Sequence, residues 1–385
     1  MTRRRRLRLT IAGLVAGTLV ATWAATGASA RPAGKSPEGV IVFNGEGNNL
    51  NAYAAEPPFT KQTVIRNHDD DPQKGLDINA QICFFPGGSN RFIAGEDTGQ
   101  PNPPQGWGIF QLRGTQVGKL SAKQVGKLTP TYQPSSDNAE NYGCGFLSDG
   151  RVVTTDIGDQ LPGQPANGQL IVWFPPFNSR NVRYCKIDIG IATAGGIFVD
   201  KQDRVYVPSG RSGPPEAGVY RYSGPFPTSD DEQGGCGGTD STGAPMAPSA
   251  NKELLIRLGD GLSAPIAIVR APKSGFYVSS VITGVINEYD ANGSFIRSVL
   301  QPPASETLGE QTFSTGTPLG VGVGPDGTIY YADIGITITA DGIGPGPEGT
   351  VRRIRFVRGE PQPPEIMGGG LAFPDGIGVY TPKKK

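Results

Sequence analysis

Short runs of alternating apolar and polar residues recur along most of this chain, separated by turns rich in glycine, aspartate and asparagine. The clearest example is TPLGVGVGPDGTIYYAD, residues Thr317–Asp333. In this segment two apolar runs flank a Pro-Asp-Gly turn. An Asp-Gly turn between alternating runs is typical of a β-hairpin, because glycine adopts the positive φ that the turn requires. The segment therefore predicts two antiparallel strands.

The same order, two joined runs followed by a third, is found in several other segments. They are Ile82–Leu112, Gly143–Phe174, Gly195–Gly224, Ala264–Leu300 and, with its third run included, Thr317–Val357. Apolar residues rarely recur at the three- and four-residue spacing of a helix. The pattern predicts an all-β protein built from repeated antiparallel sheets.

The two ends of the repeat pattern complement each other. The first repeat, Gly39–Tyr53, lacks a first strand, and FPDGIGVY at Phe373–Tyr380 resembles a lone first strand. Joining them completes a sixth four-stranded sheet and closes a ring. We therefore predict a six-bladed β-propeller, with a seven- or five-bladed ring as the alternative. The glycine-rich insert Thr228–Ser249 is expected to be a surface loop.

The first 30 residues have the composition of a secretory signal. Five arginines precede an apolar stretch, Leu9–Trp23, and Ala28-Ser29-Ala30 fits the small-residue cleavage rule. The arginines also resemble the twin-arginine export signal, although Arg6 stands where that signal has an apolar residue. We expect a signal at 1–30, a linker at 31–38, a propeller at 39–385, and a protein that is secreted or held in the periplasm or cell envelope.

The charge balance disfavours some classes of partner. The chain has 35 basic and 35 acidic residues, and removal of the signal takes away five arginines and no acids. The mature protein is then mildly acidic, which argues against a nucleic-acid or anionic-membrane partner. We expect a monomer that binds a small-molecule or carbohydrate ligand.

Four cysteines remain after export, in a compartment that permits disulfides. Cys83 and Cys144 lie in first strands of adjacent repeats, where neighbouring strands come close enough to bridge. Cys185 ends the third repeat and Cys236 lies in the insert of the fourth, so we predict the pairs Cys83–Cys144 and Cys185–Cys236. The absence of a C-x-x-C motif argues against a zinc knuckle.

The segments PDGTIYYAD, GNNLNAY and VINEYDANGSFIRSVL resemble blades of the NHL-repeat propellers and of the senescence-marker/gluconolactonase family. That resemblance implies a six-bladed propeller with a divalent cation at the axis, held by a Glu, an Asn and an Asp, and an additional acid/base Asp. GEG at Gly45–Gly47 matches part of the motif that bears the Glu ligand, which would make Glu46 that ligand. Glu46 is expected in a loop between second and third strands, and the family's first-strand motifs for the Asn and Asp ligands do not occur here.

Three repeats end the second strand with the same Asp-x-Gly sequence, at Asp97, Asp156 and Asp333. In a propeller the loops after second strands and before first strands meet at one face, and Asn79 and Asn141 come from the second of these loop sets. Oxygen ligands of this kind suit Ca²⁺ or Mg²⁺ rather than zinc, and Ca²⁺ is the cation that we expect. The alternative is that each Asp caps its own turn by accepting backbone N–H groups.

Other side chains could serve a ligand at the same face. Arg211, in the loop SGRSG, could hold an anionic substrate group, and Asn79 and Asn141 could bind the substrate. Four aromatic residues could stack on a sugar or pack between blades: Trp107, Trp173, Tyr220 and Tyr331. His68 is the single histidine, which excludes multi-histidine zinc sites and disfavours a quinone-dependent sugar dehydrogenase.

Two functions follow from these observations. The first is an exported hydrolase of a lactone or similar ester that uses a Ca²⁺-like cation, held by Asp97, Asp156, Asp333 and Glu46, to polarise a carbonyl. Asp156 and Asp333 would be its catalytic residues. The second is a non-catalytic propeller that binds a carbohydrate, peptide or protein with the same face.

Overall fold

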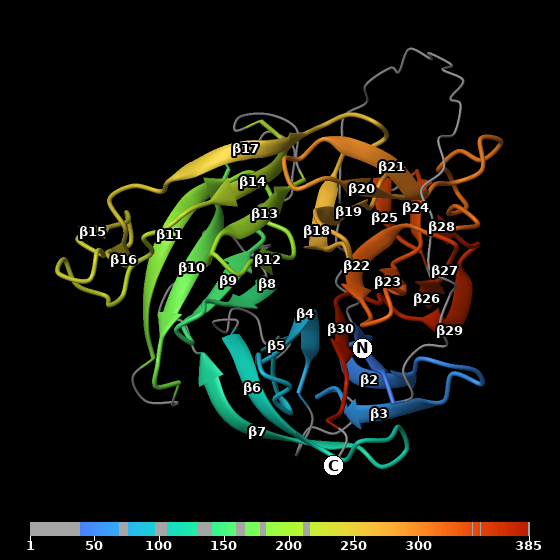
Figure 1. The fold of residues 1–385 in the computed structure, drawn as a ribbon, viewed down its shortest axis with the longest axis horizontal. Coiled ribbons are helices and arrows are strands. Elements are labelled where there is room, and N and C mark those ends of the chain that lie inside the picture. The colour runs from blue at the N-terminus through green and yellow to red at the C-terminus, as the bar shows by residue number, and fades with distance from the viewer. Residues whose placement is uncertain are drawn as a thin grey trace.

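The computed structural model describes residues 39–68, 76–96, 106–128, 141–158, 166–177, 182–210, 216–340, 342–346 and 348–383. Within these ranges the regular elements are β-strands and no α-helix occurs. Six four-stranded antiparallel blades surround a central axis, as the sequence predicts (Figure 1). No helix of the described residues is long and apolar enough to cross a membrane. The expected signal and linker, residues 1–38, lie outside the described residues.

The strands of each blade follow in order from the axis outward. Blade 1 consists of β30 (Ile377–Tyr380), β1 (Ile41–Glu46), β2 (Asn49–Ala54) and β3 (Lys61–Ile65). Blade 2 consists of β4 (Ile78–Phe84), β5 (Arg91–Glu96), β6 (Gly106–Arg113) and β7 (Ser121–Leu128). Blade 3 consists of β8 (Asn141–Phe146), β9 (Val152–Asp156), β10 (Gly168–Phe174) and β11 (Arg183–Ile191).

Blade 4 consists of β12 (Phe198–Val199), β13 (Val205–Ser209), β14 (Gly218–Tyr222) and β17 (Lys252–Arg257). Blade 5 consists of β18 (Pro265–Arg270), β19 (Phe276–Ser280), β20 (Val285–Tyr289) and β21 (Phe295–Leu300). Blade 6 consists of β22 (Pro318–Val323), β23 (Ile329–Asp333), β26 (Gly349–Ile354) and β29 (Glu365–Leu371). Three small hairpin pairs are added to this frame: β15 (Gly238–Thr239) with β16 (Pro245–Met246), β24 (Ile336–Thr339) with β25 (Gly342–Pro345), and β27 (Phe356–Val357) with β28 (Glu360–Pro361).

The ring closes by pairing the two ends of the chain, as predicted. Strand β30 pairs antiparallel with β1, with Ile41 opposite Tyr380 and Asn44 opposite Ile377. The C-terminal strand is therefore the innermost strand of the blade that the N-terminal segment completes. One detail of the predicted register is wrong: Glu46 is the last residue of β1 and does not lie in a loop, because the turn to β2 needs only two residues.

Apolar side chains from the faces of successive blades form the core. Six apolar clusters each join residues of two neighbouring blades, such as Phe43 of blade 1 with Phe92 and Phe110 of blade 2. Alternation in the strands produces this arrangement, since both faces of a blade meet a neighbour. Burial of one such side chain contributes about 2 kcal/mol, so the ring is held together by many similar contacts.

Both predicted disulfides are present. Cys83 on β4 bonds Cys144 on β8, and Cys185 on β11 bonds Cys236 in the insert. The first bond ties the innermost strands of blades 2 and 3 together.

The insert 228–249 is attached to a neighbouring blade and is more than a surface loop. It belongs by sequence to blade 4, yet its strand β16 pairs with the outer strand of blade 3 at Lys186 and Met246. The Lys186 ammonium and the Asp240 carboxylate form a buried ion pair of 2.5 Å. The insert thus covers an edge that would otherwise offer unpaired backbone groups.

Candidate functional site

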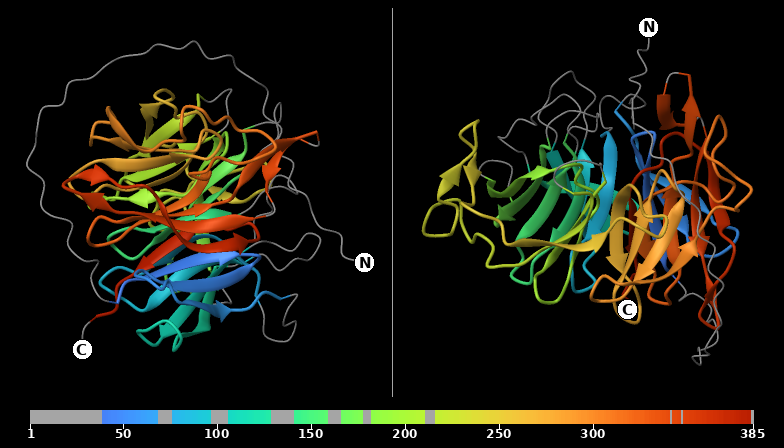
Figure 2. Two further views of the ribbon diagram at one scale, coloured as in Figure 1. Left: turned by 90° about the vertical axis from the view of Figure 1, so that its right-hand side faces the viewer. Right: turned by 90° about the horizontal axis from the view of Figure 1, so that it is seen from above.

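The candidate site is the face where second strands end and first strands begin, called the axial face below. Several connections on this face are long, including residues 301–317 between β21 and β22 and the segment between β23 and β26 that forms the hairpin β24–β25 (Figure 2). On the opposite face, first and second strands are joined by short turns such as Gly324–Thr328. Long loops on a rigid frame are where propellers and other scaffolds place binding residues.

Asp333, at the end of β23, has partners for both carboxylate oxygens. Oδ1 accepts hydrogen bonds from the backbone N–H groups of Thr317 (2.7 Å) and Gly335 (3.0 Å). Oδ2 accepts from the Thr350 hydroxyl (2.8 Å) and from Nη2 of Arg352 (2.9 Å). The carboxylate and the guanidinium are both almost fully buried. Asp333 therefore caps its turn and neutralises a buried cation.

Asp156, at the end of β9, has the same local arrangement. It is 2% exposed, and its Oδ1 accepts a hydrogen bond from the backbone N–H of Gly158 (3.1 Å). Gly158 and Gly335 both have positive φ, 72° and 67°, which a residue with a side chain rarely adopts. The repeated Asp-Ile-Gly sequence is thus explained by a turn in which Asp caps and Gly bends the chain.

The middle residue of that sequence fills the axis. Ile157 and Ile334 belong to one apolar cluster drawn from blades 3, 5 and 6. Its buried members are Tyr142, Ile157, Ala264, Ile266, Val281, Leu319, Ile334 and Ile336. The hairpin β24–β25 contributes Ile336, so this cluster joins the axial loops to the first strands.

The predicted metal ligands of the described residues contact protein groups. In the described part of the chain no group of three or more His, Cys, Asp or Glu side chains is placed to hold a metal ion. Asp156 and Asp333 lie in blades 3 and 6, on opposite sides of the ring. Glu46 Oε1 accepts from Asn51 (2.8 Å) and from the Lys61 ammonium (2.6 Å). A cation at Asp333 would have to displace the Arg352 guanidinium, and the roles of Asp156 and Glu46 as metal ligands stay predictions.

The remaining predicted residues are dispersed. Asp97 and Arg211 lie outside the described residues, so their roles stay predictions. Asn141 donates its side-chain amide to the carbonyl of Gly106 (2.8 Å). Asn79 Oδ1 is buried without a hydrogen-bond partner in the described residues and lies against Gly95. Their roles in substrate binding also stay predictions.

The aromatic residues considered for sugar stacking are buried between blades. Trp107, Trp173 and Tyr331 are fully buried and Tyr220 is 9% exposed. Trp173 instead donates its indole N–H to the Thr154 hydroxyl (2.8 Å). Stacking on a sugar is therefore excluded for these four side chains in this fold.

One acid at the axial face was missed by the sequence analysis. Asp375 precedes β30 and is 5% exposed, and its Oδ2 accepts from the backbone N–H of Ala80 (3.0 Å) on the neighbouring blade. Burial raises the pKa of this carboxyl to about 6, against the opposing effect of hydrogen bonds from Ala80 and Tyr142. The alternation in FPDGIGVY indicates a closing strand, and no local pattern shows that its Asp is buried against the neighbouring blade.

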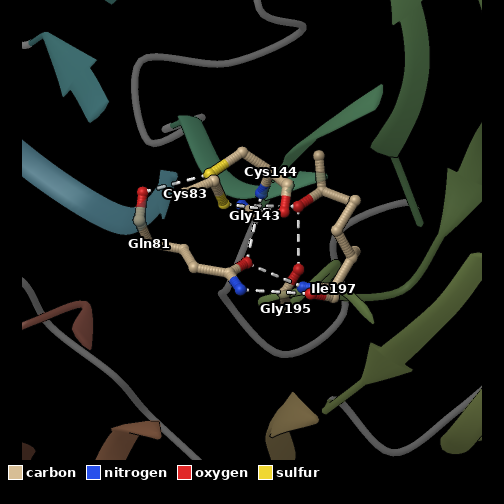
Figure 3. The surroundings of a disulfide bond; sticks show 7 residues. Gln81, Cys83, Gly143, Cys144, Gly195 and Ile197 are labelled. Atoms are coloured by element: carbon tan, nitrogen blue, oxygen red, sulfur yellow. Dashed lines mark hydrogen bonds between the residues drawn. A yellow bond between two sulfur atoms is a disulfide. The ribbon is translucent and has the colours of Figure 1, made fainter. Parts of the chain in front are cut away.

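Near the other end of the axis, three blades are tied together around the Cys83–Cys144 disulfide (Figure 3). Gln81 Oε1 accepts from the backbone N–H groups of Cys144 (3.1 Å) and Ile197 (3.0 Å), and its Nε2 donates to the Ile197 carbonyl (3.1 Å). The side chain of blade 2 thus reaches blades 3 and 4. An open groove of about 500 Å³ next to this network is lined by Phe146, Phe198 and other residues of these blades.

Comparisons with known proteins concern the fold alone. No protein-family model and no curated protein matches the sequence. Solved structures that are similar include a luciferin-regenerating enzyme (12% identity, 79% of this chain and 85% of that chain covered, TM-score 0.48). Others are regucalcin of Agrobacterium tumefaciens, a calcium-binding protein (13%, 79% and 85%, 0.42), and a gluconolactonase of Xanthomonas campestris (13%, 74% and 75%, 0.40). Propellers of the type that the sequence resembles are therefore among its structural neighbours.

Proposed function

We propose that this chain is an exported, non-catalytic β-propeller that binds a peptide segment of a partner protein with its axial face. The main support for this proposal is the state of Asp333. Its two carboxylate oxygens accept hydrogen bonds from two backbone N–H groups, a hydroxyl and the Arg352 guanidinium. A carboxylate in that state is available neither to coordinate a cation nor to take a proton from water. The repeated aspartates are then part of the frame that carries the binding loops.

A peptide suits this face better than a sugar does. The four aromatic side chains suited to stacking on a sugar are buried. The hairpin β24–β25 instead presents Ile338, 38% exposed, and holds it in place through a hydrogen bond from the Ile338 N–H to the Gly309 carbonyl (2.7 Å). An exposed apolar side chain among long loops offers a peptide apolar surface to bury. Export is supported by the two disulfides, which persist in oxidising compartments.

A peptide array probed with the signal-free protein tests this function. We expect wild type to bind a subset of peptides, Ile338→Arg to lose them, and Val125→Arg to keep them. Val125 is a matched control because it is 47% exposed on β7, at the outer rim of the ring. Binding that is equal in all three proteins, or no binding to any peptide, would contradict the proposal.

A hydrolase remains the second candidate because of Asp375. A buried carboxyl whose pKa is raised to about 6 has the property that acid/base catalysis requires near neutral pH. A panel of lactones and aryl esters separates the candidates. Under the binding proposal no substrate is turned over, whereas turnover that disappears in Asp375→Asn would favour the hydrolase.

A further inference from the structure

Three apolar side chains of the axial face adjoin one another at the hairpin β24–β25. Ile336 and Ile338 alternate along β24, so their side chains lie on the same face of the hairpin, and Ile338 stands opposite Ile343 of β25. Ile336 is buried in the apolar cluster at the axis, and Ile343 and Leu308 pack against that cluster while staying partly exposed. Leu308 precedes Gly309, whose carbonyl accepts the hydrogen bond from Ile338. We call Leu308, Ile338 and Ile343 the hairpin ridge.

The segments that carry the hairpin ridge have charges of one sign. Residues 301–348 contain no Lys, Arg or His. Glu310 follows Gly309 in the loop beside the hairpin, and Glu348 lies between β25 and β26. Both side chains are exposed, and neither forms an ion pair with another described residue. Any ligand that packs on the ridge therefore meets uncompensated carboxylates.

A third carboxylate of the same loop, Glu306, is also negatively charged. Hydrogen bonding to the side chain and the backbone N–H of Ser314 holds the pKa of the Glu306 carboxyl below its ordinary value, and the N–H contact measures 2.7 Å. Arg352 reaches this loop through a hydrogen bond from Nη1 to the Ser314 carbonyl (2.6 Å). Its guanidinium is buried, however, and its charge is balanced by Asp333, so it does not neutralise Glu306.

We infer that the peptide bound at the axial face is basic. An apolar side chain of the partner packs on the hairpin ridge, and Lys or Arg residues beside it lie near Glu306, Glu310 and Glu348. This inference rests on the proposed peptide-binding function and names the class of peptide. Complementary charges raise the association rate and select against acidic segments. Because Glu310 and Glu348 are exposed, the attraction should weaken as salt rises.

Fluorescence anisotropy with two labelled peptide pools and the disulfide-intact, signal-free protein tests the inference. The pools have the same length and the same central leucine. Flanking positions hold lysine or serine in the basic pool and glutamate or serine in the acidic pool. At about 25 mM NaCl we expect the basic pool to bind at least about tenfold more tightly, and this difference to shrink at about 300 mM NaCl.

Three variants separate the charged contact from the apolar contact. Glu310→Lys should remove most of the preference for the basic pool, whereas Glu232→Lys should keep it. Glu232 is a matched control because it is an exposed acid in the insert between β14 and β17, which joins strand ends on the face opposite the axial face. Ile338→Ser should weaken the binding of both pools, because it removes apolar surface without changing the charge. Thermal melting checks that each variant is folded.

The outcomes distinguish the inference from the function on which it rests. The inference is overturned, and peptide binding stands, if the two pools bind equally, if the preference does not fall with salt, or if Glu310→Lys keeps it. If wild type binds neither pool, the peptide-binding function itself fails and the inference fails with it.

Discussion

At the residue scale, the Asp-Ile-Gly sequences that begin at Asp156 and Asp333 have three structural roles. In Asp-Ile-Gly the aspartate caps the turn, the glycine supplies positive φ, and the isoleucine enters the axial cluster. At Asp333 the cap is combined with a buried ion pair to Arg352. Spacing along the chain predicted the repeated turn. It could not show which atoms the Asp333 carboxylate contacts, because three of its partners lie 16 to 19 residues away in the sequence.

Replacing Asp333 tests whether it is structural. We expect Asp333→Asn to lower the free energy of unfolding by about 3 kcal/mol, because it leaves the buried Arg352 guanidinium without its counter-charge. The matched control is Asp149→Asn. It removes the charge of a carboxylate that pairs with Arg151 and is 49% exposed, so it should lower the free energy of unfolding by about 0.5 kcal/mol or less. Chemical denaturation measures both; equal effects would contradict the structural role.

Asp375 should make stability depend on pH in a recognisable direction. Its pKa is raised from 3.8 to about 6 by burial, so the folded protein binds this proton more tightly than the unfolded chain does. Its contribution to stability is therefore fully present below about pH 4 and is lost as pH rises through about 6. Asp375→Asn removes this dependence.

Comparing wild type with Asp375→Asn isolates the contribution of this carboxyl to the pH dependence of stability. Between pH 4 and pH 7 we expect the variant to gain about 2.5 kcal/mol of stability relative to wild type. Urea denaturation at both pH values measures the difference. If the stability difference between the two proteins is the same at pH 4 and pH 7, the pKa of Asp375 lies near its ordinary value.

At the scale of elements, the sequence predicted the blades well and the insert poorly. Alternation and Asp-Gly turns set the strands, and the strand order placed Cys83 beside Cys144, so this pairing could be predicted. The attachment of residues 228–249 to blade 3 could not, since it depends on one parallel bridge and on the ion pair between Lys186 and Asp240. Neither interaction has a local sequence pattern.

The second disulfide should make a large contribution to holding the insert on that edge. It closes a separation of 51 residues, for which chain entropy gives a stabilisation of about 4 kcal/mol. We expect the double variant Cys185→Ser, Cys236→Ser to melt at a lower temperature and to aggregate faster, because the edge of β11 becomes accessible. Calorimetry and light scattering measure these effects, and a variant that matches wild type in both would show that the ion pair alone suffices.

At the scale of the whole molecule, stability depends on closure of the ring. Six apolar clusters join successive blades, and the cluster between blades 6 and 1 includes Ile377 of β30. An open ring would lose that contact and expose the edge of β1. Closure was predictable because a missing strand at one end and a spare strand at the other are visible in the sequence.

Deletion of residues 373–385 should therefore unfold the protein or lower its melting temperature by more than about 10 °C. Deletion of residues 381–385 alone is the matched control, because it leaves β30 intact. The control should melt within about 2 °C of wild type. If both truncated proteins melt alike, closure by β30 does not determine stability.

Titration calorimetry of Ca²⁺ into the metal-free, signal-free protein, with elemental analysis of the protein as purified, tests the central claim most directly. If the repeated aspartates serve the frame of a binding propeller, elemental analysis finds no stoichiometric metal, and no saturable binding occurs up to about 1 mM Ca²⁺. One bound cation per chain, with an affinity that falls in Asp156→Asn while the melting temperature of the metal-free protein stays unchanged, would contradict the account and make the cation-dependent hydrolase the leading function.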